Sequence, residues 1–148
     1  MSHRDNASFG KRQEYSIVAE LLKRNFDVYM TLIDDQGIDC VVRLSEKNYL
    51  DIQIKARSKD VKYHHRFAGM RFDPRVNLYF IFYTEKDNKF WVIPSQDLAP
   101  MCQLNKSGKN AGKRTLDLPS RDDGEKAGRF RRFEGDNGFN VLRGCTGN

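Results

Sequence analysis

Polar and apolar residues alternate strictly over residues 50–57 of this 148-residue chain. Strict alternation predicts a β-strand, because successive side chains of a strand point to opposite faces. The apolar run at 38–42 predicts a neighbouring strand, and the polar residues at 45–48 indicate the turn between the two. Asp39, at the start of the first strand, would then face Gln53 and Lys55 on the second. A carboxylate, an amide oxygen and an ammonium group in this arrangement suit a divalent cation beside a phosphodiester.

A helix is predicted over residues 11–25, after a loose leader at residues 1–9. On a helical wheel Glu14 points along the apolar stripe, whereas Glu20 falls on the solvent face, where it can pair with Arg24. A buried carboxylate is costly unless it is paired or metal-bound, which makes Glu14 a candidate site residue. A negative charge favoured by the helix dipole in the first turn explains Glu14 as well. The stripe consists of Tyr15, Ile17, Val18, Leu21 and Leu22.

The pattern between this helix and residue 94 completes a mixed sheet. A strand at 26–32 and a turn at 34–37 follow the helix, and residues 58–77 are interpreted as a basic loop with a single helical turn. The continuous apolar run at 78–83 predicts a buried central strand, and the run at 90–94 predicts its hairpin partner.

Signals are weaker after residue 94. Ser95 can cap a short helix at 96–101, which Pro100 must end early. The remainder is rich in Gly, Lys, Arg and Asp, with short strands predicted at 115–118 and near 139–142. The whole pattern indicates an α/β fold, in which helices pack against a mixed sheet and an irregular basic tail follows.

Length and composition indicate one folded domain, with 31% charged and 39% hydrophobic residues. No apolar run approaches the roughly 20 residues that span a bilayer, and the first residues lack an apolar signal core. We therefore expect no membrane partner and no export. We divide the chain into a main domain at 1–102 and a basic C-terminal extension at 103–148 that packs on it.

Histidines and cysteines give no sign of a metal site. Cys40, Cys102 and Cys145 are widely separated, which indicates neither a disulfide framework nor zinc binding, and we expect a cytoplasmic protein. Neighbouring residues diverge in a strand or helix, so His64 and His65 are interpreted as a pair on a surface loop.

The formal net charge of +6 lies mostly in the last third of the chain, together with aromatic residues. A basic balance favours a polyanionic partner such as nucleic acid, because phosphate contacts release counterions. A well-solvated surface is the other explanation. The alternation at 50–57 likewise has a plain explanation as the polar face of a half-exposed strand, and Asp39 could be a turn residue.

Glu14 on a helix, Asp39 on a strand and Gln53-Ile54-Lys55 on the next strand resemble the pattern of the PD-(D/E)XK nuclease superfamily, in a Gln-x-Lys variant. Residues 10–22 are similar to the first helix of its archaeal Holliday-junction resolvases, and the likeness covers about residues 10–94. The resemblance implies a restriction-endonuclease-like αβββ core with a mixed central sheet flanked by helices.

The resemblance also implies a role for each residue. Asp39 would be the principal ligand of Mg²⁺ or Mn²⁺, completed by the side-chain oxygen of Gln53 and the backbone carbonyl of Ile54. Glu14 would hold a metal-bound water or a second ion. Lys55 would orient the attacking water or stabilise charge on the phosphate.

Gln53 departs from the family pattern, which usually has an acid at this position. The site thereby loses one negative charge and should bind Mg²⁺ more weakly. Asp51, about 6.6 Å away on the same strand face, could supply the missing charge. Loss of catalysis is the other outcome.

The expected function is that of a metal-dependent endonuclease that hydrolyses DNA phosphodiester bonds. The alternatives are a catalytically inactive nucleic-acid-binding protein of the same fold and a protein–protein interaction module. A homodimer is suggested by analogy with the superfamily alone. Contacts with the DNA backbone are expected from basic residues of the 58–77 loop and its neighbourhood and of the tail: Arg57, Lys59, Lys62, Arg66, Arg71, Lys106, Lys109, Lys113 and Arg114.

Overall fold

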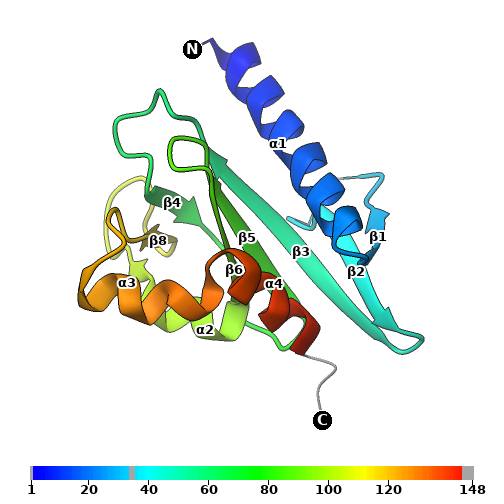
Figure 1. Ribbon diagram of the computed structural model, residues 1–148. Coiled ribbons are helices and arrows are strands. Elements are labelled where there is room, and N and C mark those ends of the chain that lie inside the picture. Colours follow the sequence, from blue (N-terminus) through cyan, green and yellow to red (C-terminus); the bar gives the residue numbers. More distant parts are fainter. Residues whose placement is uncertain (1, 34–35, 145–148) are drawn as a thin grey trace.

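The computed structural model describes residues 2–33 and 36–144, so Asp34, Asp35 and Cys145 lie outside the described residues. A five-stranded sheet forms the centre of the protein (Figure 1). Its strands are β1 (Asp27–Met30), β2 (Cys40–Ser45), β3 (Asn48–Arg57), β5 (Leu78–Thr84) and β6 (Lys89–Pro94). The strand order is β1-β2-β3-β5-β6; β3 and β5 run parallel and the other pairs are antiparallel. The predicted mixed sheet is confirmed.

A second, antiparallel sheet and four helices complete the fold. The sheet has the order β4-β8-β7, from β4 (Arg66–Met70), β7 (Gln103–Leu104) and β8 (Arg114–Asp117). The helices are α1 (His3–Lys23), α2 (Ser95–Met101), α3 (Gly124–Phe130) and α4 (Gly135–Gly144), with a 3₁₀ turn η1 (Arg131–Phe133) before α4. Helix α1 packs on the β1–β3 side of the central sheet, and α4 packs on β6 (Figure 1). None of the described helices combines the length and apolar character needed to cross a bilayer.

Strand β5 is buried on both faces, which explains its unbroken apolar sequence. Tyr79 and Ile81 pack in the core beneath α1 and α4, and Phe80 and Phe82 pack in a second core against the smaller sheet. The ring of Phe67 on β4 lies 4.9 Å from that of Phe82. The prediction of a central buried strand is confirmed.

Strand β3 alternates as predicted. Leu50, Ile52 and Ile54 are buried in the core beneath α1, whereas Gln53 and Lys55 on the opposite face are half-buried. A tight turn joins β2 to β3, with Ser45 paired to Asn48. The sheet therefore presents a row of polar side chains along its longest strand.

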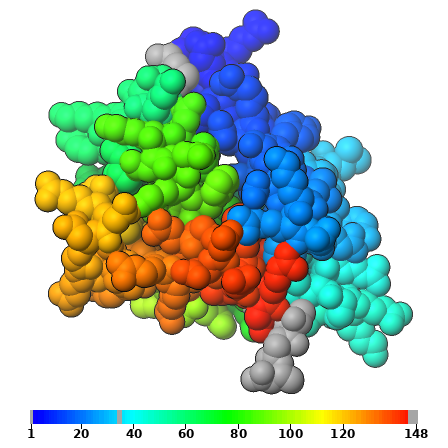
Figure 2. Space-filling view, viewed as in Figure 1, coloured from blue at the N-terminus to red at the C-terminus, as the bar shows by residue number. Residues whose placement is uncertain are grey.

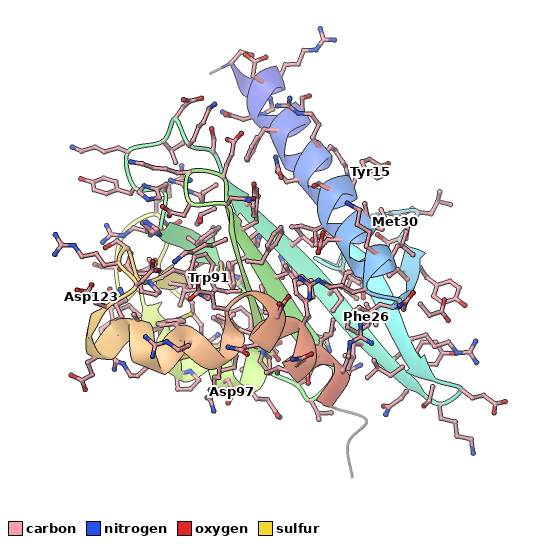
Figure 3. All side chains as sticks on the ribbon, in the orientation of Figure 1. Tyr15, Phe26, Met30, Trp91, Asp97 and Asp123 are labelled. Atoms are coloured by element: carbon pink, nitrogen blue, oxygen red, sulfur yellow. The ribbon has the colours of Figure 1, made fainter. Side chains whose placement is uncertain are left out.

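The predicted loose leader is wrong, because α1 begins at His3. The Ser2 hydroxyl accepts a hydrogen bond from the Asp5 N–H, and the Asp5 carboxylate accepts one from the Ser2 N–H. This reciprocal capping box fixes the start of the helix. Tyr15 and Leu22 are 63% and 54% exposed, so they do not belong to the buried stripe; Figure 3 shows Tyr15 on the outer side of α1.

The predicted irregular tail is also wrong. Residues 139–142 form part of α4 rather than a strand, and Phe139 and Leu142 are buried, three residues apart on one helix face. Close packing requires Gly138, where a Cβ would lie 2.2 Å from the Phe133 carbonyl oxygen. Figure 2 shows the α3–α4 segment, in orange and red, packed against the neighbouring parts of the protein.

Two further predictions are corrected. The 58–77 segment contains strand β4, which pairs with β8 across a long sequence separation that local pattern does not encode. Ser95 does not cap α2 from outside; the helix begins at Ser95. Its hydroxyl instead donates to the Arg75 carbonyl oxygen and accepts from the Arg75 N–H. Pro100 lies inside α2, which continues to Met101.

Candidate functional site

Asp39 directly precedes β2 and is attached to β3 by two hydrogen bonds. Its N–H donates to the Ile52 carbonyl oxygen at 2.8 Å, and its Oδ2 accepts from the Ile54 N–H at 2.6 Å. The regular pairing of β2 with β3 starts with Cys40 opposite Ile52. The Asp39 carboxylate thus accepts from the Ile54 N–H, which lies past the last residue of β3 that pairs with β2. This hydrogen bond holds the negative charge of Asp39 beside β3.

Gln53 lies between Ile52 and Ile54 and is therefore level with Asp39 along β3. Its amide contacts Gly37: a Cβ at Gly37 would lie 3.3 Å from the Gln53 Nε2 and 3.6 Å from its Oε1. Gly37 has a φ of +68°, a conformation that residues with a side chain rarely adopt. Glycine therefore allows the loop before Asp39 to pass directly over the Gln53 amide.

A cavity of about 390 Å³ borders Gln53. Arg71 and Arg75 line it together with Gln36 and Gly37. Asp73 also lines the cavity, and Arg75 is paired with Asp51, so the cavity wall carries charges of both signs. Arg75 was not among the predicted site residues, and its only signal in the sequence was its place in a basic segment.

Asp51 does not add an uncompensated charge to the site. Its Oδ2 lies 2.7 Å from Nη2 of Arg75, so the two side chains form an ion pair. The charge of this carboxylate is therefore balanced before any cation arrives. It does not replace the acid missing at Gln53.

Glu14 lies near the middle of α1, because the helix begins at His3. The explanation that Glu14 serves the first turn of the helix is therefore wrong. Its side chain is only 18% exposed and pairs with Nζ of Lys11 at 2.8 Å. Glu20, by comparison, pairs with Arg24 at 3.0 Å, as predicted.

The thiol of Cys40 lies in the core beneath α1. Burial raises the pKa of this thiol to about 12, with further contributions from the negative charges of Asp39 and Glu14. The prediction of Cys40 as a core thiol is confirmed, because its side chain is fully buried.

Lys55 follows Gln53 by two residues on the same face of β3 and lies beside Phe82 of β5. The Ile54 side chain between them points into the opposite core. Gln53, Lys55 and the Ile54 backbone thus lie on one short segment of β3, and Asp39 joins this segment through the Ile54 N–H. Glu14 lies on α1, which covers the opposite face of β3, the face of Ile52 and Ile54.

The predicted DNA-contacting residues differ in how far they are already engaged. Arg66 pairs with Asp117 at 2.7 Å, and Arg114 lies over the Phe72 ring and donates to the Phe72 carbonyl oxygen. Arg57 donates to the carbonyl oxygen of Tyr63 at 3.3 Å. Arg66 is nevertheless exposed, as are Lys59, Lys62, Arg71, Lys106 and Lys109, whereas Lys113 is half-buried.

The interpretation of His64 and His65 as a pair on a loop is confirmed, because they lie in a turn at 62–65. In this turn the two side chains converge, and both Nε2 atoms approach Oδ2 of Asp87. The pair therefore forms a cluster of its own on a loop that follows β3.

Comparison with known proteins shows which solved structures share the fold of this chain. No protein-family profile matches the chain, and no curated protein matches it. The bacterial homing endonuclease I-Ssp6803I superimposes with a TM-score of 0.66 and 17% identity, over 93% of this chain and 92% of that one. Hjc, a Holliday junction resolvase from Archaeoglobus fulgidus, superimposes with a TM-score of 0.50 and 18% identity, over 73% and 83%. The chain thus shares its restriction-endonuclease-like fold with both nucleases.

Proposed function

We propose that the protein is a divalent-metal-dependent endonuclease that hydrolyses DNA phosphodiester bonds. The observation that carries the proposal is the Asp39 carboxylate, held 2.6 Å from the Ile54 nitrogen between Gln53 and Lys55. The fold supports it, because the two structures compared above are a homing endonuclease and a Holliday junction resolvase.

The donor atoms fit Mg²⁺ or Mn²⁺, because all of them are oxygens. Asp39 and Glu14 offer carboxylates, Gln53 offers an amide oxygen and Ile54 offers its carbonyl, which are the ligands that hard cations prefer. The N–H and C=O of one strand residue point to the same side, so the Ile54 carbonyl faces the side of Asp39. A bound cation would supply Lewis-acid activation of the phosphate and of a water molecule.

The remaining side chains would position the substrate. The Lys55 ammonium would stabilise negative charge that develops on the phosphate, or orient the attacking water. Arg71, in the cavity beside Gln53, would hold the neighbouring backbone phosphate. The exposed Lys59, Lys62, Lys106 and Lys109 would extend the contact along the duplex. A second copy of the chain would be needed to cut both strands at once.

An inactive DNA-binding protein of the same fold is the second candidate. One observation favours it: Gln53 is neutral, and the nearby Asp51 is already paired with Arg75. Of the proposed ligands, Asp39 and Glu14 bring negative charge, and Glu14 is paired with Lys11. A cation would bind such a site more weakly than a site with three acids.

Plasmid cleavage with Mg²⁺ or Mn²⁺ separates the two candidates. Two pairs of variants are matched by residue type: Lys55→Ala with Lys47→Ala, and Glu14→Gln with Glu20→Gln. Lys47 lies in the β2–β3 turn, and Glu20 has the same kind of ion pair on the same helix.

If the protein is a nuclease, plasmid is cleaved in a metal-dependent reaction. Lys55→Ala and Glu14→Gln should abolish this cleavage, and both control variants should retain it. DNA binding that weakens with salt, without cleavage in either metal, would establish the inactive binder instead. Absence of salt-dependent binding would overturn both candidates.

A further inference from the structure

A cluster of metal-ligand side chains lies outside the proposed nuclease site. His64 and His65, from the turn after β3, meet Asp87 from the turn between β5 and β6. Each side chain offers one ligand atom, and the three atoms lie within 4.8 Å of one another. The Nε2 atoms of His64 and His65 are 3.4 Å and 3.1 Å from Asp87 Oδ2.

An ordinary histidine–aspartate ion pair explains this cluster poorly. Among the described residues, Asp87 Oδ2 is buried without a hydrogen-bond partner, and so is Nδ1 of His65. The two imidazole centroids are only 3.7 Å apart, which disfavours a charge on both rings.

The spacing of the ligand atoms matches a tetrahedral metal centre. Zinc lies about 2.0–2.2 Å from imidazole nitrogen and carboxylate oxygen, so adjacent ligands of a tetrahedral site are about 3.3 Å apart. The two histidine–aspartate separations of 3.1 Å and 3.4 Å lie on either side of this value. The separation between the two histidine ligand atoms is within 4.8 Å, so two of the three spacings match the tetrahedral value.

We propose that His64, His65 and Asp87 form a binding site for Zn²⁺ or a similar transition-metal ion, with a fourth ligand from solvent. Two imidazoles and one carboxylate suit this class of cation, whereas Mg²⁺ prefers oxygen alone. The cation would neutralise the Asp87 carboxylate. It would also increase the distance between the imidazole rings of His64 and His65. The nearby ammonium groups of Lys86 and Lys126 would repel the cation, so we expect an affinity below that of an all-thiolate site.

The site would fasten the turn after β3 to the β5–β6 hairpin. Weaker links already join these segments: the Glu85 N–H donates to the Arg57 carbonyl oxygen, and the Lys59 N–H donates to the Glu85 carboxylate. A metal ion would add bonds at the far end of the same turn. It would thereby order the segment that carries Lys59 and Lys62, close after Lys55 of β3.

Zinc binding by the full chain tests the proposal. The protein is stripped with a chelator, dialysed, and titrated with Zn²⁺ alone by calorimetry, while Co²⁺ is used to record the visible absorption of a tetrahedral centre. The variants are His65→Ala and the conservative Asp87→Asn, and the control is His3→Ala, an exposed histidine in the first turn of α1. Circular dichroism checks that each variant is folded.

The proposal predicts one Zn²⁺ per chain, a rise in melting temperature with Zn²⁺, and binding weakened by more than about tenfold in both ligand variants. His3→Ala should bind like the wild type. Equal Zn²⁺ binding by the wild type and both folded ligand variants, or a wild type without the Co²⁺ spectrum, would overturn it. Asp39→Asn should keep this site whether or not the protein is a nuclease, so the two proposals can fail separately.

Discussion

The Oδ2 of Asp39 lies 2.6 Å from the backbone nitrogen of Ile54, the residue between Gln53 and Lys55. The bond extends the contact of β3 with the preceding strand past Cys40, where the regular pairing ends. The same contact orients the carboxylate toward the proposed cation site. The position of Asp39 is therefore fixed by the backbone of β3 as well as by its own strand.

Replacement of Asp39 should separate its charge from its structural role. Asp39→Asn keeps an oxygen that can accept from Ile54, so the fold should remain stable while metal-dependent cleavage falls by about 10²-fold or more. Asp39→Ala should also leave the Ile54 N–H without this acceptor, at a cost of about 1–3 kcal/mol in the free energy of unfolding. Urea unfolding and cleavage rates measure the two effects. Equal stability of the Asn and Ala variants would contradict the structural role.

Gln53→Glu should strengthen metal binding. The new carboxylate would lie level with Asp39 and restore the acid that the superfamily pattern has at this position, which increases attraction for a divalent cation. Cleavage should then reach half its maximum at a lower Mg²⁺ concentration than in the wild type. Gln53→Ala is the control and should shift the requirement in the opposite direction. An unchanged Mg²⁺ requirement in both variants would exclude Gln53 as a ligand.

Gly37→Ala should lower both stability and activity. Gly37 has a φ of +68°, and an added methyl would lie 3.3 Å from the Gln53 amide nitrogen, so the change strains the loop by about 1 kcal/mol and displaces Gln53. Gly10→Ala on α1 is the control, because nothing lies within 4 Å of its Cβ position. It should stabilise the helix by about 0.5–1 kcal/mol. Thermal melts and cleavage assays compare the two, and a neutral Gly37→Ala would contradict the close approach.

Gly138→Ala should weaken the packing of α4 on the rest of the protein. The added Cβ would lie 2.2 Å from the Phe133 carbonyl oxygen, and relief of this overlap should cost about 1–3 kcal/mol of unfolding free energy. Gly128→Ala on α3 meets nothing within 4 Å and should be neutral or stabilising. Chemical denaturation measures both. If Gly138→Ala were as stable as Gly128→Ala, the C-terminal helices would not pack as described.

Cys40 should make the protein less stable at alkaline pH. The folded state raises the pKa of this thiol from 9.0 to about 12, so its stability contribution is fully present below pH 9. It is lost between about pH 9 and 12, because the unfolded chain ionises first. Cys40→Ala should flatten the fall in unfolding free energy over this range. Cys102→Ala, with a thiol pKa of about 11, should act over a narrower range. An unchanged pH dependence in Cys40→Ala would contradict the burial of this thiol.

The amino-acid pattern alone was enough to predict the elements whose burial is periodic. Alternation fixed the two faces of β3, the unbroken apolar run identified β5 as a strand buried on both sides, and helical spacing placed Glu14 on the inner face of α1. In each case the evidence is a repeat of hydrophobic residues within the element itself. The repeat arises because one side of the element faces the core and the other faces solvent or a second core. The resemblance to the nuclease motif depended on these same elements, and the shared fold agrees with it.

Contacts between residues that are far apart in the sequence could be identified only from the folded structure. The pairing of β4 with β8, the ion pair of Asp51 with Arg75, and the convergence of His64 and His65 on Asp87 all join segments separated by turns whose geometry local pattern does not encode. The Gly- and Arg-rich tail likewise becomes α4 because Phe139 and Leu142 find a core provided by the central sheet. Helices of this length are marginal alone, so burial against the sheet stabilises what propensity leaves undecided.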